Sequence, residues 1–184
     1  EKAMDLGVDI FPGFPAQKYL QDENGQVCGV TTGDMGVNKQ GEQKATWAPG
    51  MDIFAKQTIF AEGSRGHLGK QIIKQFSLDE GKSPQHFGIG FKEIWEIESD
   101  KHCPGNVVHT AGWPLNKGTS GGGFLYHFEN NRIAVGLIVD LNYTNPHLNP
   151  FQEFQKYKHH PVIKQFLENG KRISYGARAI TKGG

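Results

Sequence analysis

Glu62 and Gly63 form the first segment whose residue types could serve a ligand. They lie between an apolar stretch, residues 53–60, and a segment with helical periodicity, residues 67–76. A glycine lets the backbone approach a ligand closely, and an acidic side chain beside it can accept hydrogen bonds from ribose or adenosine hydroxyls. The same residues equally fit a tight turn with Arg65 in solvent. The spacing leaves both interpretations open.

Three consecutive glycines, residues 121–123, form the second candidate segment, and Phe124 and Tyr126 follow them. Glycines expose backbone N–H and C=O groups that no side chain covers. A planar apolar ligand with carbonyl oxygens, such as a quinone, needs one or two such donors and flanking aromatic surface. The alternative is a flexible hairpin base. The bunched apolar residues could also contact a membrane interface.

Other motifs predict no catalytic side chain and no metal ligand. A G-x-S-x-G pattern surrounds Ser120, but it precedes an aromatic strand, whereas a nucleophile elbow follows a strand and opens a helix. His159 and His160 are adjacent, which favours capping or surface positions over metal binding. Cys28 and Cys103 fit no metal or redox spacing. The dinucleotide fingerprint G-x-G-x-x-G is absent.

The composition limits the class of protein that must position these segments. The 184 residues include 25 Gly and 9 Pro, which argues against a helical bundle or coiled coil. The hydrophobic fraction is 36%, with 12 Phe, so a core can form. With 20 basic and 19 acidic residues, nothing favours nucleic-acid binding. The longest apolar run, residues 133–139, is too short to span a bilayer.

In the first half, local patterns predict short strands and one helix. The expected elements are strands at 8–11 and 53–60, a hairpin over 16–32, a turn or second hairpin around 39–41, and a helix over 67–76. Asn24-Gly25 predicts a type I′ turn for the first hairpin. The strand over 53–60 is expected to run directly into the turn that contains Glu62.

The second half predicts mostly strands. The expected elements are strands at 86–97, 107–113 and 172–180, a long hairpin with arms 124–128 and 132–141, and helices at 150–157 and 162–167. Asn149 and Pro150 are typical of a helix start. The expected fold class is α+β, with a large, mainly antiparallel sheet and a few short helices. Glu1–Leu6 is typical of the end of a helix stopped by Gly7, so we expect an excised segment of a longer chain.

Together these residues resemble the electron transfer flavoprotein–ubiquinone oxidoreductase family. The resemblance covers essentially the whole chain and is carried by long stretches that are not only glycine. They are residues 58–63 with 66–68, 88–90 with 92–93, 109–110, 112–115, 121–122, 124–127, 145–146, 150–151, 158–161, 170–173 and 175–179.

The resemblance implies a fold and an activity. Residues 1–80 would belong to an FAD-binding domain of the glutathione-reductase/hydroxylase-like fold, and residues 81–184 to an inserted ubiquinone-binding domain. The full enzyme would accept electrons from reduced electron transfer flavoprotein through a 4Fe-4S cluster and FAD, and would reduce ubiquinone to ubiquinol. It would lie peripherally on the bacterial or mitochondrial inner membrane.

The resemblance also assigns site residues. Glu62 and Gly63 would contact the flavin, and the backbone of Gly121 and Gly122 would contact the ubiquinone head group. Phe124 and Tyr126 would supply apolar or membrane-facing surface. The cluster ligands and the rest of the flavin site would lie outside this segment, so the segment alone would be inactive.

Two alternatives stay open from the sequence. One is a non-catalytic module that binds lipid, quinone or another protein. The other is a related FAD-dependent monooxygenase or a geranylgeranyl-reductase-like enzyme, which would share the flavin fold and lack the cluster.

Overall fold

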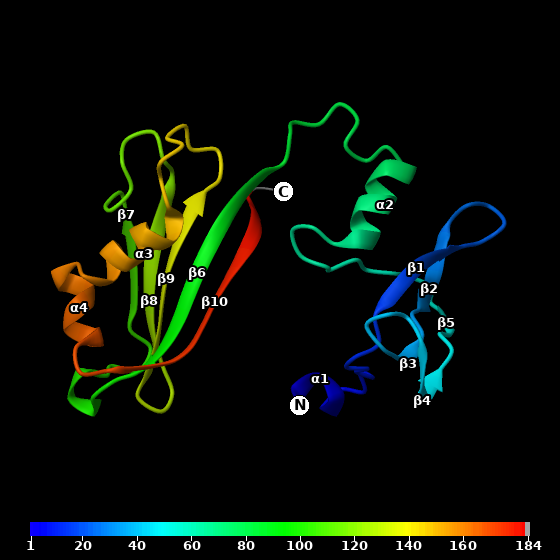
Figure 1. Ribbon diagram of the computed structural model, residues 1–184, viewed down its shortest axis with the longest axis horizontal. Helices are drawn as coiled ribbons and strands as arrows, with labels where there is room; N and C mark the ends of the chain where they lie inside the picture. Colours follow the sequence, from blue (N-terminus) through cyan, green and yellow to red (C-terminus); the bar gives the residue numbers. More distant parts are fainter. Residues whose placement is uncertain (183–184) are drawn as a thin grey trace. The chain divides into compact units, whose positions relative to one another are not determined.

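A computed structural model describes residues 1–182, and the chain forms two compact units, Glu1–Glu80 and Gly81–Gly184. Figure 1 shows the elements of each unit. Four α-helices and three separate antiparallel sheets make up the regular structure of the described residues. The expected class, antiparallel sheet with a few short helices, is therefore confirmed.

The first unit holds two small sheets and two helices. Its elements are α1 (Lys2–Asp5), β1 (Ala16–Gln21), β2 (Val27–Thr32), β3 (Met35–Val37), β4 (Gln43–Ala48), β5 (Asp52–Phe54) and α2 (His67–Gln75). One sheet has the strand order β1-β2-β5, and β3 pairs with β4 in the other. Both predicted hairpins and the helix over 67–76 are thus present.

The two hairpin turns have the same construction. The Asp22 carboxylate accepts the backbone N–H of Asn24 at 2.9 Å, and only Gly25 has a positive φ, at 78°. Asn38 and Gly41 repeat the arrangement, with φ 84° at the glycine. The predicted type I′ turn at residues 24–25 is wrong, because it requires positive φ at both positions. The aspartate side chain instead stabilises a turn that needs one left-handed residue.

Two predicted strands of this unit are absent or short. Residues 8–11 form no strand, and the stretch predicted over 53–60 is a strand only in β5, which pairs with three residues of β2. After Phe54 the N–H of Ala55 still donates to the Cys28 carbonyl of β2 at 2.9 Å, and Ile59, further along the chain, is 87% exposed. An apolar segment without a neighbouring strand gains no ladder hydrogen bonds, so sequence pattern alone does not make it a strand.

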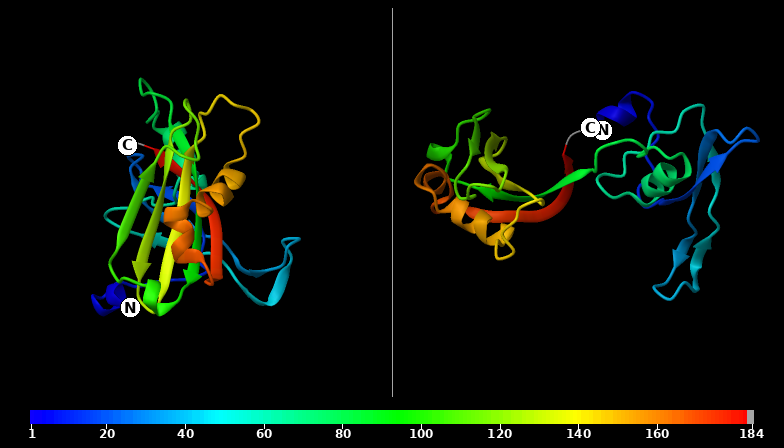
Figure 2. Two further views of the ribbon diagram at one scale, coloured as in Figure 1. Left: turned by 90° about the vertical axis from the view of Figure 1, so that its left-hand side faces the viewer. Right: turned by 90° about the horizontal axis from the view of Figure 1, so that it is seen from above.

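The second unit is a five-stranded antiparallel sheet with two helices packed on one face (Figure 2). The strand order is β10-β6-β9-β8-β7. Its elements are β6 (His86–Glu96), a 3-10 turn (Ser99–Lys101), β7 (Val107–Ala111), β8 (Gly121–Phe128), β9 (Arg132–Asp140), α3 (Pro150–Lys158), α4 (Pro161–Leu167) and β10 (Lys171–Lys182).

Alternation along β9 determines which side chains form the core. Residues 133, 135, 137 and 139 are buried against α3 and α4, where Phe154 and Ile163 contribute. Leu125 of β8 lies opposite Val135 and joins them. The intervening residues form the face opposite α3 and α4, which we call the opposite face. The members used below are Gly122, Phe124 and Tyr126 of β8, Gly136 of β9, and His109 of β7.

The starts and turns of these elements follow local chemistry. The Asn149 side chain accepts the N–H of Gln152 at 3.2 Å and caps α3, as the sequence predicts. Between β8 and β9, Asn130 and Asn131 both have positive φ, 62° and 53°. The conformation predicted for Asn24-Gly25 therefore occurs in this hairpin instead.

Candidate functional site

At Gly121, strand β8 is still paired with β9 on one side, but its pairing with β7 on the other side has ended. The Ser120 carbonyl accepts the N–H of Asp140 at 2.9 Å, so residue 120 directs its backbone groups toward β9. Successive residues of an antiparallel strand direct these groups to opposite edges. Those of Gly121 therefore face the β7 side, where the ladder ends at the pair Ala111–Gly122. The backbone groups of Gly121 therefore lie beyond the last ladder pair with β7.

Gly122 and Gly123 are placed differently. By the same alternation, the backbone groups of Gly122 face Ile138, its partner on β9, within the paired region. Those of Gly123 face Thr110, its partner on β7, which is also within the ladder. Of the glycines named by the sequence, only Gly121 extends past the β7 ladder.

Packing within the chain also requires these three glycines. A Cβ on Gly121 would overlap the carbonyl oxygen of Ile138, and one on Gly122 would lie 2.6 Å from the carbonyl oxygen of Thr110. A Cβ on Gly123 would overlap the ring of Tyr157. The glycine run is therefore explained by steric needs as well as by a ligand, and it does not by itself identify a binding site.

Phe124 and Tyr126 form an aromatic surface on the opposite face. The Phe124 ring lies over Gly136, where a Cβ would overlap it. It stacks on Tyr126 with ring centroids 4.8 Å apart. The Tyr126 hydroxyl lies 2.7 Å from Nε2 of His109 on β7. Sequence reasoning missed His109, because only the register between β7 and β8 places it beside these rings.

On the helix side of the same strands, a second tyrosine has a structural role. The Thr110 hydroxyl donates to the Tyr157 hydroxyl at 3.1 Å. Burial raises the pKa of Tyr157, and the hydrogen bond from Thr110 opposes this in part. Tyr157 therefore keeps its proton and holds α3 against β7 and β8.

In the first unit, Glu62 caps a helix. Its carboxylate accepts the backbone N–H of Leu68 at 3.3 Å and of Gly69 at 2.6 Å, and Nδ1 of His67 lies 3.4 Å away. Helix N-termini attract anions, and here the carboxylate occupies that position on α2. The Glu62 carboxylate therefore already accepts two backbone N–H groups of α2.

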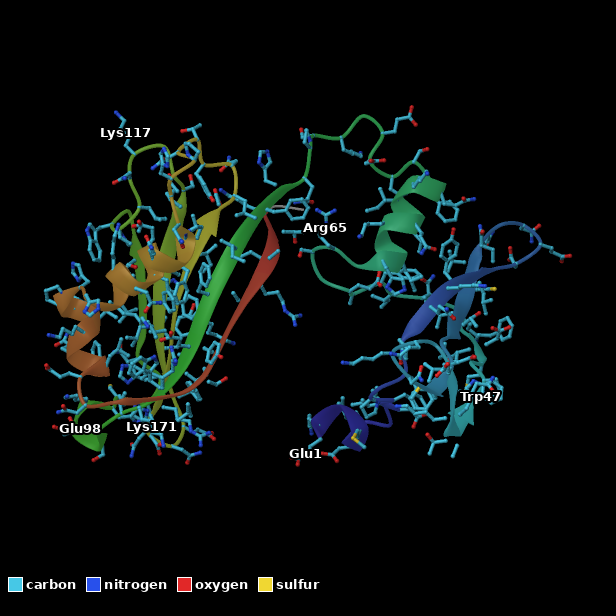
Figure 3. The ribbon with its side chains drawn as sticks, in the orientation of Figure 1. Glu1, Trp47, Arg65, Glu98, Lys117 and Lys171 are labelled. Atoms are coloured by element: carbon cyan, nitrogen blue, oxygen red, sulfur yellow. The ribbon has the colours of Figure 1, made fainter. Side chains whose placement is uncertain are left out.

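Gly63 keeps the properties that a cofactor contact needs. Its φ is 77°, and nothing lies within 4 Å of a Cβ built there. Arg65 is exposed in the loop that precedes α2 (Figure 3). Of the pair predicted to contact flavin, the backbone of Gly63 is thus the group that remains available.

The first unit also contains a cavity of about 380 Å³ that sequence reasoning missed. It is lined by Pro15, Ala16, Gln17, Gly33, Asp34, Val37 and His67. The carboxylate of Asp34 is already used by the N–H of Gly50 at 2.9 Å and Nε1 of Trp47 at 3.2 Å. No sequence motif marks this cavity, because the segments that line it meet only through the fold.

The histidines and cysteines for which we expect no catalytic or metal-binding role have other positions in the structure. Nδ1 of His160 accepts the N–H of Val162 at 3.3 Å and caps α4. Cys28 and Cys103 are free and belong to different units. Within residues 1–182, no group of three or more His, Cys, Asp or Glu side chains could hold a metal ion. No helix in this described range is long and apolar enough to cross a membrane.

Comparison with known sequences identifies close relatives. The family model described as "ETF-QO, ubiquinone-binding" matches residues 87–180. The electron transfer flavoprotein-ubiquinone oxidoreductase of Pseudomonas aeruginosa is 62% identical over the whole chain, which covers 34% of that protein. The mitochondrial proteins of the same name from Arabidopsis thaliana and Homo sapiens are 51% and 50% identical, and the chain covers 29% and 30% of them. The chain thus spans about a third of the length of these relatives.

Comparison with solved structures shows the fold. The flavin-dependent brominase Bmp2 is similar over 98% of this chain and 40% of its own, with a TM-score of 0.58 and 13% identity. A mutant of the same brominase gives a TM-score of 0.54. At this identity the likeness concerns the backbone fold alone.

Proposed function

The chain belongs to the ETF-QO ubiquinone-binding family, and we propose that residues 81–184 bind the ubiquinone head group while residues 1–80 contribute to an FAD-binding domain. In the longer protein, electrons would pass from reduced electron transfer flavoprotein through a 4Fe-4S cluster and FAD to ubiquinone. The family match lies within the second unit, which supports assigning the quinone to that unit.

The cofactors differ in how well the described residues fit them. Gly63, with its positive φ and open surroundings, suits a close backbone contact with FAD, whereas the Glu62 carboxylate is used by α2. A bound flavin supplies the two electrons that the quinone needs. The two cysteines of the described residues do not suit a 4Fe-4S cluster, which takes four thiolates. We therefore place the cluster ligands elsewhere in the longer protein.

The observation that carries the quinone assignment is the position of Gly121. Its backbone groups face the side on which the β7 ladder has ended, and Phe124 lies on the opposite face two residues beyond Gly122. A quinone carbonyl can accept a hydrogen bond from the Gly121 N–H while its ring rests on apolar surface. The protein's role is then to bind and orient the quinone.

Photoaffinity labelling tests this assignment directly. A short-chain ubiquinone that carries a photoreactive group is irradiated with the flavin- and cluster-loaded full-length protein, and labelled peptides are identified by mass spectrometry. We expect label on residues 111–126, and we expect excess unlabelled ubiquinone to prevent it. Label confined to other peptides, or unaffected by competition, would contradict the quinone site. Substitution of Gly121 is a poor test, because a Cβ there overlaps Ile138.

A matched pair of variants provides the functional test. Phe124→Leu removes the ring that rests on Gly136 and should raise the KM for ubiquinone, because apolar contact with the quinone is lost. Phe128→Leu, at the far end of the same strand, should leave the KM unchanged. Equal effects of the two substitutions would contradict a quinone site near Phe124.

The proposed location is the surface of a respiratory membrane, where ubiquinone is dissolved. Support comes from the curated names of the plant and human relatives, which are described as mitochondrial. Sedimentation of the full-length protein with ubiquinone-containing vesicles tests this location. Recovery of all the protein in the supernatant would contradict it.

A further inference from the structure

The hydrogen-bonded pair of Tyr126 and His109 lies on the opposite face, near the proposed quinone position. We propose that this pair delivers a proton to the quinone as it is reduced, an assignment that rests on the proposed quinone site at Gly121. The Tyr126 hydroxyl and Nε2 of His109 are 2.7 Å apart, with rings tilted at 55°. The pair therefore already forms a connected route for a proton.

The register of the sheet places the pair close to the glycines. His109 lies opposite Phe124, and Ala111, two residues further along β7, lies opposite Gly122. Gly121 is three residues from Phe124 along β8, a span of about 10 Å. A para-quinone carries its carbonyl oxygens at opposite ends of the ring. A ring bound through one oxygen at Gly121 therefore has a second oxygen to protonate within this part of the face.

The chemistry balances as follows. Reduction of a quinone to a quinol consumes two electrons and two protons, and each carbonyl oxygen becomes a hydroxyl. A flavin bound in the longer protein would supply the electrons. The Tyr126 hydroxyl donates its proton to one quinone oxygen, and the Nε2–H of the His109 imidazolium replaces it. Water supplies the other proton.

The geometry of a protonated imidazole suits this direction of transfer. Both ring nitrogens of an imidazolium are donors, so Nε2–H donates to the Tyr126 oxygen and leaves the hydroxyl hydrogen for a ligand. His109 is exposed, so its ring can exchange protons with solvent. The stacked ring of Phe124 covers one side of Tyr126 and holds it in place.

The surroundings of the pair on this face are mostly uncharged. The residues opposite Tyr126 and Phe124 on β9 are Ala134 and Gly136. The charged residues of the other strands that share the face are Arg132 and Asp140 on β9, Lys92 and Glu96 on β6, and Lys171, Arg178 and Lys182 on β10. None of these charged residues lies directly opposite Tyr126 or His109 in the strand register.

The test compares two electron acceptors in the flavin- and cluster-loaded full-length protein. Tyr126→Phe and His109→Gln should each slow reduction of a soluble ubiquinone analogue on the order of 10²-fold, the usual scale of general acid catalysis. Reduction of ferricyanide, which takes electrons without protons, should be unchanged.

Binding and control measurements complete the test. Equilibrium binding of the ubiquinone analogue should persist in Tyr126→Phe, and His147→Gln, in an exposed loop, should behave as wild type. Equal losses with both acceptors, loss of quinone binding, or an unchanged quinone rate would each overturn the donor role. A wild-type protein that reduces ferricyanide but no quinone would instead overturn the proposed function itself.

Discussion

Glu93 shows how a single residue connects the elements of the second unit. Its carboxylate is 2% exposed and lies 2.9 Å from Nζ of Lys158 on α3 and 3.3 Å from Arg172 on β10. Nε1 of Trp95 donates to it at 2.8 Å. The Lys158 ammonium also lies over the rings of Trp95 and Phe154. The carboxylate therefore fixes α3 and the β10 edge to β6.

Removal of this carboxylate should be costly. We expect Glu93→Gln to lower the free energy of unfolding by about 3 kcal/mol, because the largely buried ammonium of Lys158 is left without its counter-charge. Lys156→Gln, which breaks an exposed pair with Glu153, should cost less than about 1 kcal/mol. Urea denaturation followed by tryptophan fluorescence measures both. Similar values for the two variants would show that burial does not strengthen the Glu93 pair.

His127 is a second buried polar residue, 4% exposed, on the helix side of β8. Its Nδ1 accepts the N–H of Cys103 at 3.2 Å, and Nε2 has no hydrogen-bond partner among the described residues. Its ring meets the ring of Phe166 edge-on at 5.1 Å. Burial, and then the nearby His102, lower the pKa of His127.

This pKa shift predicts a pH dependence of stability. The unfolded chain protonates this histidine at its ordinary pKa, about 6.5, whereas the folded chain does so only at lower pH. Between these values the unfolded state binds more protons, so stability falls as pH drops below about 6.5. His127→Gln should reduce this acid-side slope, measured by urea midpoints at several pH values. A slope equal to that of wild type, or an equal change in His147→Gln, would argue against this origin.

At the scale of elements, close helix–strand packing determines where glycine is required. The ring of Tyr157 on α3 lies against Gly123 of β8, whereas Gly176 of β10 has nothing within 4 Å of a built Cβ. The two glycines look alike in the sequence. Only the packing of α3 on the sheet distinguishes them.

This difference predicts opposite outcomes for the same substitution. Gly123→Ala should destabilise the second unit by about 1–3 kcal/mol, since the added methyl overlaps the Tyr157 ring. Gly176→Ala should be neutral or slightly stabilising, because it restricts the unfolded chain without a clash. Thermal unfolding of both variants provides the measurement. A neutral Gly123→Ala would mean that α3 can shift at little cost.

At the scale of the whole molecule, the two units differ in their cores. The connected hydrophobic core consists of residues of the second unit, from Ile97 to Leu167. In the first unit, Leu68 is the one hydrophobic side chain among those described as buried. Several of its large apolar side chains are exposed, Phe54 and Ile59 among them. By itself, the first unit buries little of the apolar surface that stabilises a fold.

Hydrogen exchange should reveal this difference in the 184-residue chain. Amides of β1 and β2 should exchange much faster than those of β8 and β9, because local stability follows buried apolar contact. Mass spectrometry of peptides after timed labelling makes the comparison. In the full-length protein we expect the first unit to gain protection, since additional chain can cover its exposed apolar residues. Equal protection of both units in the short chain would contradict this expectation.

Local patterns in the sequence determined much of the secondary structure. The hairpin over 16–32, the amphipathic helix over 67–76 and the Asn149 cap depend on interactions within a few residues, so they could be predicted. The strand predicted over 53–60 is too long. A strand needs a neighbouring strand to pair with, and β2 pairs with only three residues of β5, which the apolar pattern could not reveal. The turn at Asn24-Gly25 was mistaken because the side chain of Asp22 competes for the same backbone groups.

The site shows the same division. The residue types alone indicated Gly121, Phe124 and Tyr126 as ligand-binding candidates, and family resemblance gave the ligand. Only the tertiary structure decided that Gly121 lies past the β7 ladder and that His109 bonds Tyr126, because strand register is a non-local property. It also decided that Glu62 caps α2, since a carboxylate goes to the nearest uncompensated backbone N–H groups.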